Sequence, residues 1–149
     1  MTGSERFLMF TTAIAVPVAL GVETLVRTLL APPDFVQLRA VLRATLTPVA
    51  WGVCGAALLA SVVGLVLAKR FYARADARFL DAADEPRRRR ARMGVFLLVA
   101  SVPQIPALLA TFLFSFGAAL TPVLVAAAIS SAGVIAQARR VGEIGRAHV

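Results

Sequence analysis

The sequence is poor in the residues on which soluble enzymes depend. It has one cysteine, Cys54, and one histidine, His148, and charged residues make up only 16% of its 149 residues. A typical soluble domain carries roughly 25%. A single cysteine forms neither an intrachain disulfide nor a thiolate metal site. The sequence also has no glycine-rich phosphate loop, no His/Glu metal spacing and no nucleophile beside a base. We therefore expect no enzymatic activity, no cofactor and no metal.

Apolar residues are abundant instead, at 59% of the chain, which excludes disorder. Four stretches are long and apolar enough to cross a bilayer, whose core of about 30 Å takes about 20 helical residues. They are residues 7–31, 48–68, 94–116 and 118–138. None shows the two-residue alternation of a barrel strand. The predicted fold class is an all-α integral membrane protein, a four-transmembrane-helix bundle formed by residues 1–142 as one domain.

The connections between these stretches differ in length and character. The third and fourth stretches are separated by a few residues around Gly117, so they should form a tight antiparallel hairpin. Pro32 and Pro33 should end the first helix, because the α region is disfavoured before a proline. The residues that follow have an apolar face and a basic face: Phe35, Leu38, Leu42 and Leu46 on one, Arg39 and Arg43 on another. This pattern predicts either a short helix in the outer interface or an N-terminal extension of the second span.

Basic residues are distributed unevenly between the two sides of the predicted bundle. With four spans, both termini and the middle loop share one side. That side holds Arg6, Lys69, Arg70, Arg74, Arg78, Arg87, Arg88, Arg89, Arg90, Arg92, Arg139 and Arg140, against Arg27, Arg39 and Arg43 on the other. Because loops rich in lysine and arginine stay in the cytoplasm, we predict a multi-pass protein of the cell membrane with cytoplasmic N- and C-termini.

The middle loop is predicted to be a basic cytoplasmic elbow, residues 69–93. Its first part continues the second helix, and Pro86 starts the next one, since proline suits the first helical turn. A run of arginines follows: Arg87, Arg88, Arg89, Arg90 and Arg92. Positive charge is unfavourable in the first turns of a helix, so helix formation does not explain the run. It indicates contact with anionic headgroups, or else a docking patch for an acidic partner. No nucleic-acid motif accompanies it.

The third stretch contains Gln104 between Pro103 and Pro106, near the expected midplane of the bilayer. Each proline lacks the N–H that would bond a carbonyl one turn earlier, so the helix should kink there. Polar and small residues recur at helical spacing and should face the bundle or another subunit: Ser101, Gln104, Ala107, Thr111 and Ser115. Two interpretations stay open, a polar constriction or ligand contact, and an interhelical hydrogen bond that supports the kink.

The first stretch carries Glu23, the only carboxylate predicted within a span. Acids inside a membrane are costly and are candidates for a functional role in ion or proton movement. Arg27 lies four residues later, however, so an i, i+4 ion pair near the interface could neutralise the charge. Pro17, in the middle of the same stretch, predicts a further kink.

The string Pro103-Gln104-Ile105-Pro106-Ala107-Leu108-Leu109-Ala110, with Leu29-Leu30-Ala31-Pro32-Pro33 at the end of the first span, resembles a group of small uncharacterised bacterial four-span membrane proteins. The third span of that group carries Glu-x-Pro-Ala-Leu-x-Gly. This chain has Gln104 at the position of the acid and Ala110 at the position of the glycine. The resemblance implies the four-span topology and no activity.

The last residues, 143–149, look like a translated sequencing adapter, so we expect an artefactual tail that includes His148. For the remainder, the leading hypothesis is a non-enzymatic accessory or assembly component that acts through helix packing and the basic elbow. Its expected partners are membrane lipids and a homo-oligomer or larger membrane complex, without nucleic acid. The alternative is a small oligomeric channel or transporter with a polar path at Gln104, Thr111 and Glu23.

Overall fold

The fold consists of four long helices, described by a computed structural model for residues 3–30, 32–77 and 85–146. They are α1 (Gly3–Leu30), α2 (Pro33–Ala77), α3 (Glu85–Ser115) and α4 (Leu120–Arg146). Each contains a segment long and apolar enough to cross a membrane. For this part of the chain, the prediction of an all-α protein with four span-length apolar helices is confirmed.

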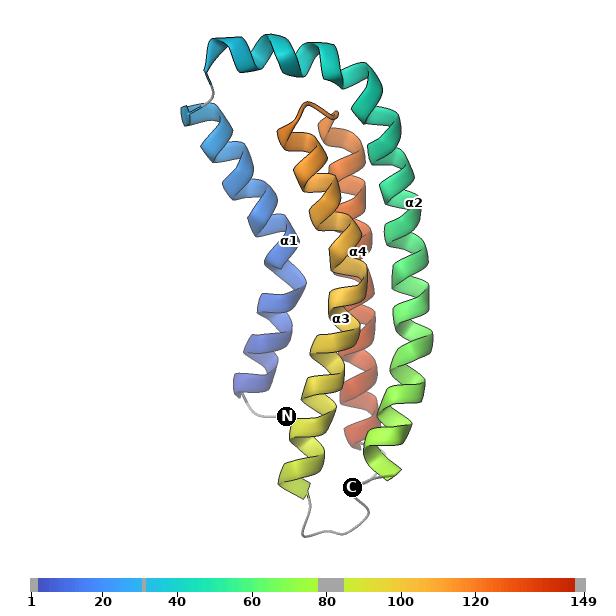
Figure 1. The fold of residues 1–149 in the computed structure, drawn as a ribbon. Helices are drawn as coiled ribbons and strands as arrows, with labels where there is room; N and C mark the ends of the chain where they lie inside the picture. Colours follow the sequence, from blue (N-terminus) through green and yellow to red (C-terminus); the bar gives the residue numbers. More distant parts are fainter. Residues whose placement is uncertain (1–2, 31, 78–84, 147–149) are drawn as a thin grey trace.

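The α3–α4 hairpin lies between α1 and α2 (Figure 1). Two clusters of buried apolar side chains run along the bundle, one around Val53, Ala110 and Phe114 and the other around Phe96 and Val134. Large apolar side chains also cover the outside of all four helices. A helix that is apolar on every face is typical of a membrane span.

The two ends of the bundle differ in composition. We call one the hairpin end, because it holds the turn between α3 and α4, and the other the basic end, where α1 and α3 begin and α2 and α4 finish (Figure 1). At the basic end, all four helices continue beyond the predicted spans into sequence rich in arginine and lysine. These residues are unfavourable in a lipid core, but they are good helix formers, so the helix continues through them. Pro86 lies in the first turn of α3 as its bounds are described, a position that suits proline. Residues 78–84 of the predicted elbow lie outside the described residues.

The N-terminal part of α2 crosses the hairpin end before the helix turns down along the bundle (Figure 1). We call residues 33–47 the strap. Of the two predictions for this segment, the N-terminal extension of the second span is confirmed, because residues 35–46 belong to the same unbroken helix as that span. Pro48, inside α2, lacks the N–H that would bond the carbonyl of Ala44, which permits a bend at this point. The strap and the second span are therefore one continuous helix whose axis changes direction (Figure 1).

The hairpin turn is closed by Gly117, whose φ is +124°. The amide of Gly117 donates to the carbonyl of Phe114 (3.1 Å), and the amide of Ala118 donates to that of Leu113 (3.0 Å). This is the Schellman arrangement that ends a helix and satisfies its last carbonyls. It sets α4 antiparallel to α3.

The prolines predicted to kink the helices, Pro17, Pro103 and Pro106, all lie inside continuous helices. Each leaves one carbonyl a turn earlier without its helical donor. The predicted tail is divided: residues 143–146 continue α4, and 147–149 lie outside the described residues.

Candidate functional site

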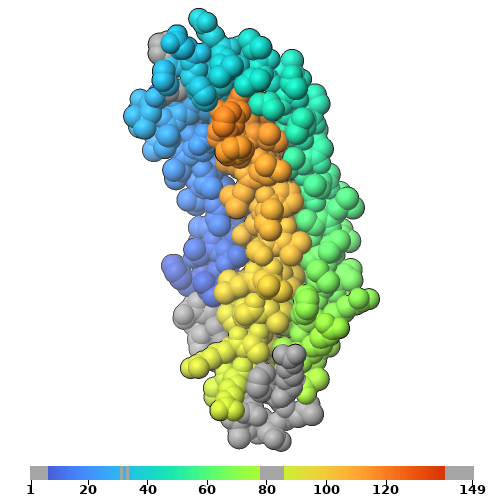
Figure 2. Space-filling view, viewed as in Figure 1, coloured from blue at the N-terminus to red at the C-terminus, as the bar shows by residue number. Residues whose placement is uncertain are grey.

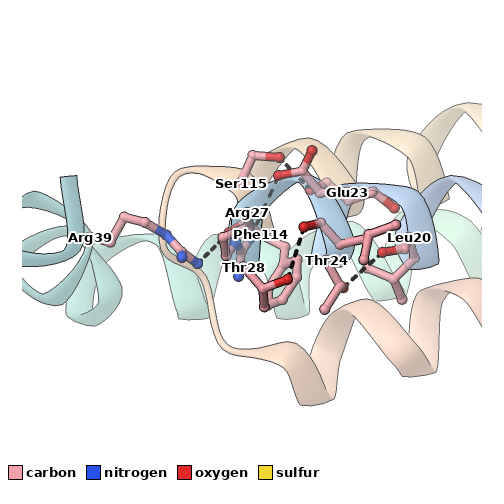
Figure 3. Close-up of polar contacts among 10 residues, drawn as sticks. Leu20, Glu23, Thr24, Arg27, Thr28, Arg39, Phe114 and Ser115 are labelled. Carbon is pink, nitrogen blue, oxygen red and sulfur yellow. Dashed lines mark hydrogen bonds and ion pairs between the residues drawn. The ribbon is translucent and has the colours of Figure 1, made fainter. Parts of the chain in front are cut away.

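At the hairpin end, two arginines from different helices converge on one carbonyl (Figure 3). Nη2 of Arg27 in α1 donates to the carbonyl oxygen of Phe114 at 2.5 Å, and Nη2 of Arg39 in the strap donates to the same oxygen at 3.0 Å. The guanidinium of Arg27 also lies over the Phe114 ring, 3.5 Å from its centroid, whereas that of Arg39 is 5.8 Å away. Phe114 therefore joins α1, α2 and α3.

The position of Phe114 explains why it attracts positive charge. It lies in the last turn of α3, where the helix dipole is negative, and its carbonyl accepts from the amide of Gly117 as well as from the two arginines. The α3 sequence has no basic residue in that turn. The two arginines therefore supply from other elements the cations that this helix end lacks.

The predicted pair of Glu23 and Arg27 is present, with Oε1 and Nη2 3.8 Å apart and side chains 29% and 15% exposed. The pair is not a local snorkelling arrangement on α1, because Arg27 reaches inward to α3. With Arg39 included, two cations face one carboxylate. The cluster carries one formal positive charge in excess.

The strap is fixed on the hairpin by two further features. A Cβ on Gly117 would lie 2.6 Å from the carbonyl oxygen of Arg39, so the turn and the strap touch through their backbones. The amide of Ala119 donates to Oγ1 of Thr47 at 3.1 Å. Figure 2 shows the strap, in cyan, lying against the turn, in orange.

In the middle of the bundle, two side chains bond consecutive carbonyls of α1. Nε2 of Gln104 donates to the carbonyl of Thr12 at 2.5 Å, and Oγ of Ser131 donates to that of Ala13 at 2.9 Å. Ala13 is the residue whose helical donor is removed by Pro17, four positions later. Ser131 thus replaces the missing helical bond from another helix.

The other predicted polar residues do not join Gln104 in a continuous path. Ser101 is exposed and donates to the carbonyl of Leu98, whereas Thr111 is buried and donates to that of Ala107. The predicted stripe therefore splits between the outer and inner faces of α3. Glu23 lies at the hairpin end, and no hydrogen bond in the described part of the chain connects it with Gln104 or Thr111.

The sequence analysis missed a polar group between α2 and α4, toward the basic end. Gln137 is 1% exposed, and within the described residues neither its Nε2 nor its Oε1 has a hydrogen-bond partner. Oγ of Ser130 and the hydroxyl of Tyr72 are likewise buried without partners there. Gly64 makes room for the amide, because a Cβ at this position would lie 2.7 Å from Nε2 of Gln137. The signal was available, since Ser130 and Gln137 are seven residues apart on one helical face.

At the basic end, Nε of Arg92 lies 2.6 Å from Oδ1 of Asp76, which links α3 to α2. We call the exposed basic residues of this end the basic collar: Lys69, Arg70, Arg74, Arg87, Arg89, Arg90 and Arg139. Arg88 is partly buried. The collar gathers charge from the ends of three helices.

Neither metal ligation nor relationship to known proteins adds a further site. Among the described residues, no group of three or more metal-ligating side chains comes together. Compared with protein-family models, characterised proteins and solved structures, the chain gives no match.

Proposed function

We propose that the chain is a non-enzymatic accessory or assembly component of the cell membrane, with the basic end and both termini in the cytoplasm. It acts by packing its apolar faces against other membrane helices and by contact of the basic collar with anionic headgroups or an acidic partner. One observation supports the proposal above all: polar side chains within the spans bond to the backbone of other helices, whereas the basic residues of the collar are exposed.

The polar residues within the spans support a packing role. Gln104, Ser131 and Arg27 each donate to a main-chain carbonyl of a different helix. Such bonds hold helices together, with an average contribution of about 0.6 kcal/mol for side chains in membranes. Side chains already committed to the backbone are poor candidates for lining a path for ions.

The collar supports contact with an anionic surface. Its members are exposed, and they lie near the ends of α2 and α4 and at the start of α3. Basic residues near an anionic leaflet contribute about 1 kcal/mol each. Their concentration at one end also favours the cytoplasmic orientation of that end.

Blue-native electrophoresis of mildly solubilised membranes tests the assembly role. We expect the full chain to migrate as part of a species larger than the 15.7 kDa chain, and the triple variant R87Q/R89Q/R90Q to reduce that species. The matched control R87K/R89K/R90K keeps the charge and should migrate like the wild type. Monomeric migration of all three proteins would overturn the proposal.

Flux through reconstituted vesicles separates this function from the alternative, a small oligomeric channel or transporter. We expect vesicles containing the protein to be as tight to protons, potassium and chloride as empty vesicles. A flux that E23Q or Q104L alters would replace the proposed function with a path at Gln104, Thr111 and Glu23.

A further inference from the structure

A groove of about 650 Å³ lies between α1 and α4 in the half of the bundle nearest the hairpin end. It is lined by Pro17, Leu20, Gly21 and Thr24 from α1 and by Leu120, Leu124, Ala127, Ala128 and Ser131 from α4. The upper part of α1 leans away from the hairpin (Figure 1), and small residues on both walls leave the space unfilled.

The wall of the groove offers almost nothing for a polar ligand. Its two hydroxyl groups are already used, because Thr24 donates to the carbonyl of Leu20 (2.8 Å) and Ser131 donates to that of Ala13 (2.9 Å). The remaining side chains are apolar. A hydrocarbon chain therefore fits this wall, and a polar solute does not.

The length of the groove identifies the kind of hydrocarbon. From Leu120 to Ser131, α4 rises roughly 16 Å at about 1.5 Å per residue. This is about half of a 30 Å hydrocarbon core, which is the thickness of one leaflet. A transmembrane helix of a partner would need a complementary face along the whole length of the span. One acyl chain extends through a single leaflet, so a groove along half of the span is long enough for it.

Beyond the lining residues at the hairpin end, the groove is followed along α1 by a positively charged cluster. Pro17, Leu20, Gly21 and Thr24 follow helical spacing, and the next position on the same face of α1 is Arg27. Arg27 lies with Arg39 in the cluster of two cations and one carboxylate described above (Figure 3). Nε of Arg39 is buried and has no hydrogen-bond partner among the described residues. Each guanidinium also has more donors than its bond to Phe114 uses.

We propose that this groove holds one acyl chain of an anionic phospholipid from the leaflet at the hairpin end, with the lipid phosphate at Arg27 and Arg39. The excess of one positive charge matches a lipid with one net negative charge, such as phosphatidylglycerol, better than a zwitterionic lipid. The chain fills the apolar groove, and the headgroup neutralises the charge at its mouth. The lipid thereby completes the contact between α1 and α4.

Native mass spectrometry of the full chain, released from nanodiscs containing equal phosphatidylglycerol and phosphatidylcholine, tests the proposal. We expect the wild type to retain one phosphatidylglycerol in preference to phosphatidylcholine. A128W places a large ring in the groove from an exposed position and should abolish this retention. The matched control L109W adds the same ring to an exposed position of α3 outside the groove and should retain the lipid.

The charge is tested separately. R39Q should weaken retention of phosphatidylglycerol roughly tenfold, as expected for the loss of one charge-assisted contact, while R39K should preserve most of it. The melting temperature with added phosphatidylglycerol gives a second readout, which should rise for the wild type and L109W but not for A128W. Equal retention of both lipids by the wild type, or equal behaviour of A128W and L109W, would overturn the proposal. So would a dimer that A128W dissociates, because a second copy would then occupy the groove.

Discussion

The hairpin end and the basic end of this bundle use positive charge in opposite ways. At the hairpin end, Arg27 and Arg39 turn inward to the last turn of α3, and the strap lies on the turn. At the basic end, Arg92 makes one ion pair with Asp76, and the collar is exposed. Arginine thus joins helices at the hairpin end, whereas at the basic end it both joins two helices, through Arg92, and forms the exposed collar. The two inward arginines meet the last turn of α3, which has no basic residue of its own.

The largest expected effect is at the hairpin turn. In G117A the added Cβ would meet the Arg39 carbonyl, and the backbone would keep a φ that side chains rarely adopt. We expect a loss of about 2 kcal/mol or more in unfolding free energy, measured by titration with denaturing detergent. G55A is the control, because nothing lies within 4 Å of its new Cβ and alanine is favoured in a helix. Equal stability of the two variants would show that the strap does not rest on the turn.

The two arginines of the hairpin end should differ in their contributions. Arg27 has the shorter bond to Phe114 and lies closer to its ring than Arg39 does. We expect R27Q to cost about 1.5–3 kcal/mol, the range for hydrogen bonds from charged groups, and R39Q to cost less. The same detergent titration measures both. If R39Q were the more damaging variant, the ring contact would not be the main interaction at this end.

Toward the basic end, the buried amide of Gln137 should destabilise the fold. Both of its polar atoms lack partners in the described residues, and burial of such groups costs about 1–3 kcal/mol. We therefore expect Q137L to stabilise the protein by about 1 kcal/mol. We also expect G64A to be less harmful in a Q137A background than in the wild type, because the clash with Nε2 disappears. Destabilisation by Q137L would mean that the amide has a partner in the membrane.

The smallest expected effect concerns the middle of the bundle. S131A removes the donor that replaces the helical bond lost at Pro17, and it should cost about 0.6 kcal/mol. In a P17A background the Ala13 carbonyl regains an N–H from α1, so the same substitution should then cost less. A double-mutant cycle measures this difference. Purely additive effects would contradict the compensation of Pro17 by Ser131.

Much of the fold could be predicted because long apolar stretches in the sequence predict helices long enough to cross a membrane. The continuity of α2 through Pro48 could not, since a proline pattern does not distinguish a bend from a break. The link from Ser131 to Ala13 was partly foreseeable, because Pro17 marks the carbonyl that needs a donor. Its donor comes from a residue far away in the sequence, and only packing identifies it.

Among the polar residues, likewise, the sequence marks those with distinctive neighbours in the chain and not those whose environment depends on packing. Gln104 stood out because prolines flank it, and its bond to α1 is the interhelical hydrogen bond of one of the two interpretations left open. Gln137 lies near the end of an apolar stretch, where an amide is ordinary, and its burial depends on Gly64 of another helix. The sequence placed Arg39 on the basic face of the segment after the first span. Its bond to the Phe114 carbonyl could not be predicted, because it depends on how the strap packs on the hairpin.

Hydrogen–deuterium exchange of the full chain in nanodiscs, with the wild type compared with R27Q/R39Q, tests most directly whether inward arginines hold one end together. We predict slow exchange of the amides of residues 33–47 and 115–119 in the wild type, faster exchange there in the double variant, and no change in residues 69–77. Unchanged exchange at the hairpin end, or an equal change at both ends, would contradict the account.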